Sequence, residues 1–143
     1  MREKEPSNLT GSPERNFTLP KSHILRGRRN FEELFSSSSL LASQNVNLRY
    51  TTYPNTDKEI LVGFIAPKKI GKAVQRTKTK RLLREAYRLN QHIITELSIT
   101  AEIGLHYAFM ARRTGLTFET VQDDVIVLLE QLRKRLMLKN SFS

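Results

Sequence analysis

The sequence contains no cysteine, so it can form neither a disulfide nor a thiolate metal site. It also has no apolar run of about 20 residues, the length that a membrane-spanning helix needs, and its N-terminus lacks the apolar core of a signal peptide. The three histidines, His23, His92 and His106, are scattered, which is more typical of surface or half-buried rings than of metal ligands. These absences predict a cytoplasmic protein that does not act at a membrane.

Residue combinations typical of protein catalysis are missing as well. The acids fall mostly on predicted helix surfaces, as at Glu32 and Asp123, and no Ser–His–Asp, Cys–His or paired-carboxylate pattern appears. The glycine spacing of a Walker phosphate loop is also absent. We therefore expect no catalytic residue, no metal ligand and no organic cofactor in this chain.

Acidic residues are almost absent from one stretch, residues 68–88, which holds nine basic residues and a single acid, Glu85. This stretch therefore contributes +8 to a chain whose formal net charge is +10. Such a concentration of one sign is typical of a surface that binds a polyanion. The nine basic residues are Lys68, Lys69, Lys72, Arg76, Lys78, Lys80, Arg81, Arg84 and Arg88.

The spacing within this stretch predicts a helix from about Ala73 to Gln91. Basic residues recur there at intervals of three and four, on the side opposite Leu83 and other apolar residues. An ordinary solvated helix face is the alternative, but such faces usually interleave both signs to form ion pairs. A face of one sign favours a partner that neutralises it.

The order of residues from Val62 to Arg88, VGFIAPKKIGKAVQRTKTKRLLREAYR, resembles the signature of the bacterial ribonuclease P protein component. The resemblance extends upstream to LRGRRNFEELF and downstream to ARRTG-LTFE, so it covers roughly Leu19 to Leu136. Three residues depart from the family pattern. Pro67 replaces a usual Ser, Thr77 a usual Asn, and Lys78 a usual Arg; Thr77 lacks the amide, and Lys78 lacks the planar fork.

The resemblance implies the protein subunit of ribonuclease P, the ribonucleoprotein that removes the 5′ leader of precursor tRNA. In that family the RNA subunit performs the hydrolysis with Mg²⁺ that it mainly holds itself. The implied partners are that RNA subunit and precursor tRNA, with no membrane and no obligate protein partner. The residues implied to bind the RNA subunit are Lys68, Lys69, Lys72, Arg76, Thr77, Lys78, Lys80, Arg81, Arg84 and Arg88.

The resemblance also implies a cleft that receives the single-stranded leader, lined by Phe31, Phe35 and Tyr50. Aromatic rings suit this role because every base has a face to stack on, whatever the sequence. The alternative is that the phenylalanines belong to the core, since Phe31, Leu34 and Phe35 form one apolar helix face. For Tyr50 the alternative is an ordinary strand aromatic that packs on its neighbours.

The patterns predict an α+β sandwich in which about three helices pack on one face of a small mixed sheet. The resemblance implies the ribosomal protein S5 domain 2-like form, with a left-handed strand–helix–strand crossover and a short extra strand near the lysine pair. We expect a tail at residues 1–18 and a single domain at 19–139. A turn at residues 54–58 predicts that the first two strands form an antiparallel hairpin. The expected elements are a helix at Phe31–Ser36, a serine-rich loop at Ser36–Gln44, strands at Val46–Tyr53, Glu59–Ala66 and Glu102–Ala111, and a last helix capped by Thr117 or Thr120.

Two other functions remain compatible with the basic helix. A structural RNA-binding protein of the ribosome would have the same helix but no leader cleft, and it would not assist cleavage of precursor tRNA. A helix-turn-helix DNA-binding protein is less compatible, because the sequence predicts no second short helix before the basic one.

Overall fold

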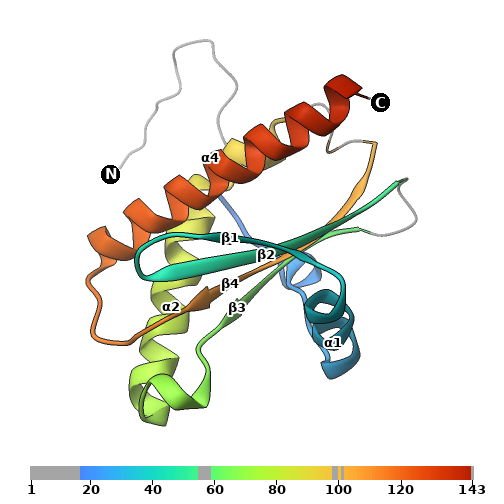
Figure 1. Cartoon of the computed structure of the whole chain (residues 1–143). Coiled ribbons are helices and arrows are strands. Elements are labelled where there is room, and N and C mark those ends of the chain that lie inside the picture. The colour runs from blue at the N-terminus through green and yellow to red at the C-terminus, as the bar shows by residue number, and fades with distance from the viewer. Residues whose placement is uncertain (1–16, 55–58, 98–99, 101, 143) are drawn as a thin grey trace.

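A computed structural model describes residues 17–54, 59–97, 100 and 102–142. It is a mixed α+β structure with a four-stranded sheet, as the sequence predicts (Figure 1). Its helices cover both faces of the sheet, whereas the expected arrangement had them on one face only. The elements are η1 (Lys21–His23), α1 (Arg28–Ser36), β1 (Ser39–Ala42), β2 (Val46–Tyr53), β3 (Ile60–Ile65), η2 (Lys68–Ile70), α2 (Ala73–Asn90), α3 (His92–Thr95), β4 (Gly104–Ala111) and α4 (Phe118–Phe142).

The strands lie side by side in the order β1-β2-β4-β3. β1 and β2 are antiparallel, β2 and β4 are antiparallel, and β3 and β4 are parallel. The expected hairpin between β2 and β3 is therefore wrong, because β4 lies between them. The residues in β4 explain this order: seven of its eight side chains are buried, so the strand needs the centre of the sheet, where both faces are covered.

Alternating side chains on the strands separate two hydrophobic layers. The larger layer lies between the sheet and helices α2 and α4, and it contains Leu48, Tyr107 and Leu132. The smaller layer lies under α1, where Leu25 and Leu34 pack on Ala108. Helix α1 therefore occupies the face of the sheet opposite to α2 and α4.

The basic helix agrees closely with its prediction, because α2 runs from Ala73 to Asn90. The last helix begins at Phe118, and the hydroxyl of Thr117 accepts a hydrogen bond from the backbone N–H of Thr120 at 3.1 Å. Thr117 is therefore the N-cap, and the alternative cap at Thr120 is wrong. The predicted apolar stripe of this helix is buried in the main core at Val121, Val125, Leu128, Leu129, Leu132 and Leu136.

Two local predictions are wrong. The serine-rich stretch expected to be a loop contains the edge strand β1, because Leu41 is buried in the main core and gives the strand an inward face. Next to the lysine pair the structure has the single turn η2, whereas the family resemblance implied a short strand there. Most of the expected tail and of the expected turn, residues 1–16 and 55–58, lies outside the described residues.

Candidate nucleic-acid interface

Helix α2 separates its basic side chains from its buried ones. Thr79, Leu83, Ala86 and Tyr87 are buried against the sheet and α4. On the other sides of the helix, Lys78, Lys80, Arg81 and Arg84 are all exposed. Among the described residues no acid pairs with any of these four cations, so their charge faces solvent. We call these four exposed residues the basic face.

The residues immediately before α2 are held in place by close packing. The backbone of Gly71 lies so near its neighbours that an added Cβ would be 2.9 Å from Oε1 of Gln75 and 3.1 Å from the side chain of Thr114. The Gln75 side chain also accepts a hydrogen bond from the backbone N–H of Lys72 at 3.4 Å. The guanidinium of Arg76 is half-buried and donates to the Gly71 carbonyl at 3.1 Å. These contacts hold the first turn of the helix in place.

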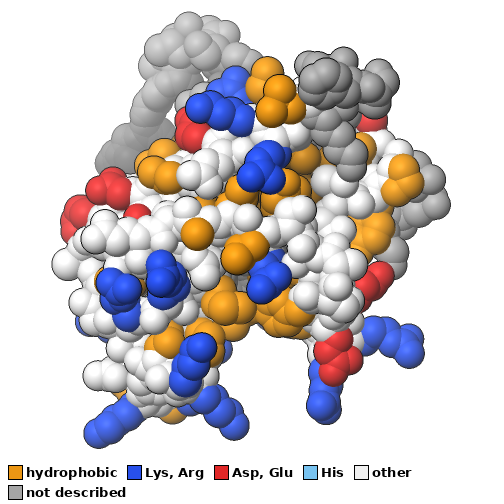
Figure 2. Space-filling view, in the orientation of Figure 1, with side chains coloured by type: hydrophobic (Ala, Val, Ile, Leu, Met, Phe, Trp, Pro, Cys, Tyr) orange, Lys and Arg blue, Asp and Glu red, His pale blue; other side chains and the backbone are white. Residues whose placement is uncertain are grey.

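The other residues predicted to bind the RNA subunit lie next to this first turn. Lys68 and Lys69 are exposed on η2, Lys72 is exposed immediately before α2, and Thr77 is exposed between Arg76 and Lys78. The structure therefore places nine of the ten predicted residues along the start and the outer side of one helix. In Figure 2 Lys and Arg side chains project in two separate places at the lower edge of the molecule, over the start of α2 at lower left and over α1 at lower right.

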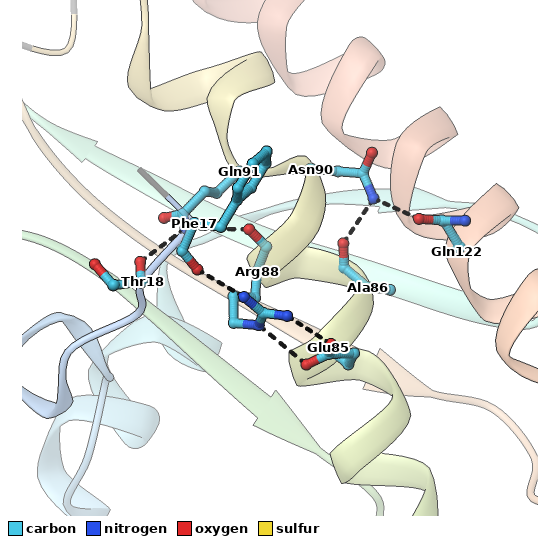
Figure 3. A network of polar contacts seen from close by, with 8 residues as sticks. All are labelled: Phe17, Thr18, Glu85, Ala86, Arg88, Asn90, Gln91 and Gln122. Carbon is cyan, nitrogen blue, oxygen red and sulfur yellow. Dashed lines mark hydrogen bonds and ion pairs between the residues drawn. The ribbon is translucent and has the colours of Figure 1, made fainter. Parts of the chain in front are cut away.

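Arg88, the tenth predicted residue, forms contacts within the fold. Its guanidinium pairs with Glu85 at 2.7 Å and donates to the Phe17 carbonyl at 3.1 Å (Figure 3). The hydrogen bond from Arg88 lowers the pKa of the Glu85 carboxyl. Gln91, one turn on, donates to the Thr18 carbonyl at 2.9 Å. Arg88 thus fastens the segment before η1 to α2 and is less available to a partner than the four cations of the basic face.

The two phenylalanines predicted for the leader cleft differ in their surroundings. Phe31 is half-buried, and its ring lies directly over Gly63, where an added Cβ would be 2.9 Å from two ring atoms. Phe35 is 39% exposed, with its ring centroid 6.2 Å from that of Phe31. The guanidinium carbon of Arg49 lies 5.7 Å from the centre of the Phe35 ring, within range for a cation–π contact.

Tyr50 does not join these phenylalanines. It points to the opposite face of the sheet, packs against the main core and lies 3.4 Å from a guanidinium nitrogen of Arg135 on α4. The strand neighbour that faces α1 is Arg49. The alternation of Leu48 and Tyr50 along β2 already indicated that these two share the core face, whereas the family resemblance had suggested the cleft for Tyr50.

Sequence reasoning missed several polar residues on the α1 side of the sheet. The ring of Tyr53 contacts that of His106 at 5.1 Å, and burial together with the nearby Glu33 carboxylate raises the pKa of Tyr53. The amide oxygen of Asn47 is buried without a hydrogen-bond partner. The even spacing of Asn47, Arg49 and Tyr53 along β2 was the signal that these residues share a face.

A pocket of about 510 Å³ lies between α1 and the basic face. Phe31 lines it from α1, and Lys80, Arg81 and Arg84 line it from α2. Phe31 and the basic face therefore border the same open space, whereas Phe35 is not among the residues that line it.

The part of the chain that the structure describes shows no group of three His, Asp or Glu side chains that could hold a metal ion. Within the same residues, no helix combines the length and the apolar character needed to cross a membrane.

Comparison with known proteins agrees with the sequence resemblance. A family model described as Ribonuclease P matches residues 19–133. The ribonuclease P protein component of Chlorobaculum tepidum is 33% identical over 140 residues, which covers 92% of this chain and 88% of the relative. The protein component of Petrotoga mobilis is 27% identical over 121 residues, covering 80% of this chain and 95% of the relative.

Solved structures of ribonuclease P proteins have the same fold. The protein from Staphylococcus aureus superposes with a TM-score of 0.62 at 20% identity, covering 78% of this chain and 96% of that one. The protein from Thermotoga maritima superposes with a TM-score of 0.60 at 25% identity, covering 76% and 96%. The chain therefore belongs to the ribonuclease P protein family, the protein components of the endoribonuclease that matures the 5′ ends of tRNAs.

Proposed function

We propose that this chain binds the RNA subunit of ribonuclease P through the basic face and η2, and the 5′ leader of precursor tRNA through the surface around Phe35. The observation that carries the proposal is the unpaired charge of the basic face. Four cations are exposed on one helix, while Glu85, the only acid of that helix, is already bound to Arg88.

Folded RNA suits the basic face better than a protein or a DNA sequence. The deep major groove of A-form RNA excludes side chains, so proteins bind such helices mainly through their shape, phosphates and 2′-hydroxyls. Exposed Lys and Arg side chains on a rigid helix can bind the phosphates of such an RNA helix. A helix-turn-helix is not supported, because α2 follows strand β3 and the element between them is the three-residue turn η2, not a helix.

The leader is a single strand, and Phe35 with Arg49 suits unpaired bases. An exposed ring offers a stacking surface that does not depend on sequence, and the guanidinium beside it can bind the adjoining phosphate. The ring of Phe31 packs against the ring of Phe35 and helps to hold it in position. The pocket lined by Phe31 and Arg81 places the ring next to Phe35 close to the basic face, which is proposed to bind the RNA subunit.

The chemistry of phosphodiester hydrolysis is assigned to the RNA subunit, together with most of the Mg²⁺. The role proposed for this chain is to position the precursor and to offset the repulsion between phosphates that the two RNAs bring together. Such neutralisation would reduce the Mg²⁺ concentration that the reaction needs.

A four-residue variant tests the proposal. Replacing the four residues of the basic face, Lys78, Lys80, Arg81 and Arg84, with alanine should leave the circular dichroism spectrum intact and abolish binding to the RNA subunit. Each lost phosphate contact should reduce the slope of log affinity against log salt concentration by about 0.7–0.9.

The matched control removes four cations elsewhere on the surface, at Lys21, Arg28, Arg133 and Lys134, all exposed and outside α2. This control should bind the RNA subunit with a slope close to that of the unmodified protein. Equal losses for the two variants would mean that only net charge matters, and normal binding by the α2 variant would reject the basic face as the binding surface.

A further inference from the structure

An exposed hydrophobic side chain, that of Val74, lies on α2 next to the basic face. Val74, in the first turn, is 82% exposed, more than any other large hydrophobic residue that the structure describes. It is nine residues, about two and a half turns, before the buried Leu83, so it points away from the core. Val74 therefore contributes nothing to the packing of this chain.

Val74 belongs to a small apolar surface. With Ala73, Thr77, Lys78 and Arg81 it lines a shallow pocket of about 460 Å³. Ala73, Val74 and Thr77 all present methyl groups, and the two cations lie at its border. The Thr77 methyl extends this surface at the position where the family resemblance leads us to expect a polar asparagine.

The charges around this surface indicate its occupant. Lys78 and Arg81 line the pocket and no acid does, so an acidic molecule that also has an apolar part is favoured. Phosphates of a paired RNA helix would satisfy the lysine and arginine but would leave the methyl groups uncovered. An unpaired nucleotide has both parts, because its phosphate can meet the cations and its base or ribose can cover the methyl groups.

We propose that the apolar surface formed by Ala73, Val74 and Thr77 binds the base or ribose of an unpaired nucleotide in the RNA subunit. This inference rests on the proposed function of α2 and extends it. The cations attract any RNA of suitable shape, whereas this apolar contact requires a nucleotide that is not paired, and it therefore favours a particular structured site. Proteins that bind nucleic acids use apolar side chains in this way against exposed bases.

The salt dependence of binding separates an apolar contact from a phosphate contact. Losing a phosphate contact flattens the log–log salt slope, because fewer counterions are released. Losing an apolar contact lowers affinity by the same factor at every salt concentration. Val74→Ser should therefore weaken binding to the RNA subunit about tenfold, which corresponds to about 1.4 kcal/mol, with an unchanged slope. Val74→Leu should retain the affinity.

Val127→Ser is the matched control, because Val127 is an exposed valine on another helix, α4, and is 46% exposed. It should bind normally, and all three variants should keep the thermal midpoint. A second pair of variants tests the Thr77 methyl: Thr77→Val should retain affinity, and Thr77→Asn should lose several-fold.

Two results would overturn the inference: normal RNA binding by Val74→Ser, or a loss of affinity with a flatter salt slope. In the first case, a loss of self-association seen by light scattering would identify a protein contact instead. Failure of the proposed function is distinguishable, since the unmodified chain would then not bind the RNA subunit, or the four-residue alanine variant would bind it normally.

Discussion

Alanine substitutions at Phe31 and Phe35 should separate folding from leader binding, although the two residues are one helical turn apart. The Phe31 ring lies over Gly63 and packs on the small hydrophobic layer under α1. Its removal should cost about 3 kcal/mol, the lower end of the range for buried phenylalanines, because the ring is only half-buried. For a domain of this size such a loss lowers the thermal midpoint by about 10 °C.

Phe35 is 39% exposed, and its truncation should leave the thermal midpoint nearly unchanged. If a leader base stacks on this ring, the loss should be about 1–3 kcal/mol, or about 5- to 150-fold in affinity. Only RNA that carries a leader should be affected. The holoenzyme containing Phe35→Ala should therefore bind precursor tRNA more weakly but bind mature tRNA normally.

The measurements are the thermal midpoint of each variant and the holoenzyme's affinity for precursor and mature tRNA. Gly63→Ala is the control for Phe31, since the new methyl group would displace the ring without removing it, and it should lower the midpoint in a similar way. The reasoning is refuted if Phe35→Ala is strongly destabilised while the folded fraction still distinguishes the two RNAs. In that case both phenylalanines belong to the core, and the leader binds elsewhere.

Two further predictions concern the residues that the structure separates from the proposed binding surfaces. Arg88→Ala should lower the thermal midpoint slightly, because Arg88 donates a hydrogen bond to the Phe17 carbonyl, and it should leave the salt slope of RNA binding unchanged. Arg84→Ala should leave the thermal midpoint unchanged and flatten the salt slope. Equal slope changes for the two variants would contradict this assignment. Tyr50→Ala should destabilise the fold and weaken the binding of precursor and mature tRNA equally. If affinity fell only for RNA that carries a leader, Tyr50 would belong to the leader-binding site.

Local sequence patterns predicted some elements closely and others not at all. The limits of α2 could be predicted because its apolar and basic residues follow the helical period over five turns, from Ala73 to Asn90. The limits of strand β1 could not be predicted, since four serines precede Leu40 and a single buried residue, Leu41, gives no period. Its position depends on pairing with β2, a contact that no local pattern reports.

The order of strands was mispredicted for a different reason. A turn between β2 and β3 suggested a hairpin, but the almost fully buried β4 takes the place between them. Sequence separation does not show which of three strands will be central. The number of buried residues in each strand shows which strand is central, and for β4 this number could have been estimated from the largely apolar Leu105–Ala111 segment.

The candidate site shows the same contrast between local pattern and three-dimensional arrangement. The sequence predicted basic residues on the outer side of α2, but it did not predict the contact of Arg88 with the Phe17 carbonyl, which depends on a segment seventy-one residues away. Arg49 escaped notice because the family resemblance drew attention to Tyr50. The period of two along β2 would have favoured Arg49 for the α1 face.

The most direct measurement is cleavage of precursor tRNA by a bacterial ribonuclease P RNA at a low Mg²⁺ concentration, with and without this chain. The account predicts that the chain restores cleavage at the mature 5′ end and that the stimulation grows with leader length until the leader spans the Phe35 surface. The four-residue α2 variant should give no stimulation. If the unmodified chain binds the RNA subunit but cleavage is the same with and without it, or is equally stimulated for precursors with and without an extended leader, the proposed division of labour between the two surfaces is wrong.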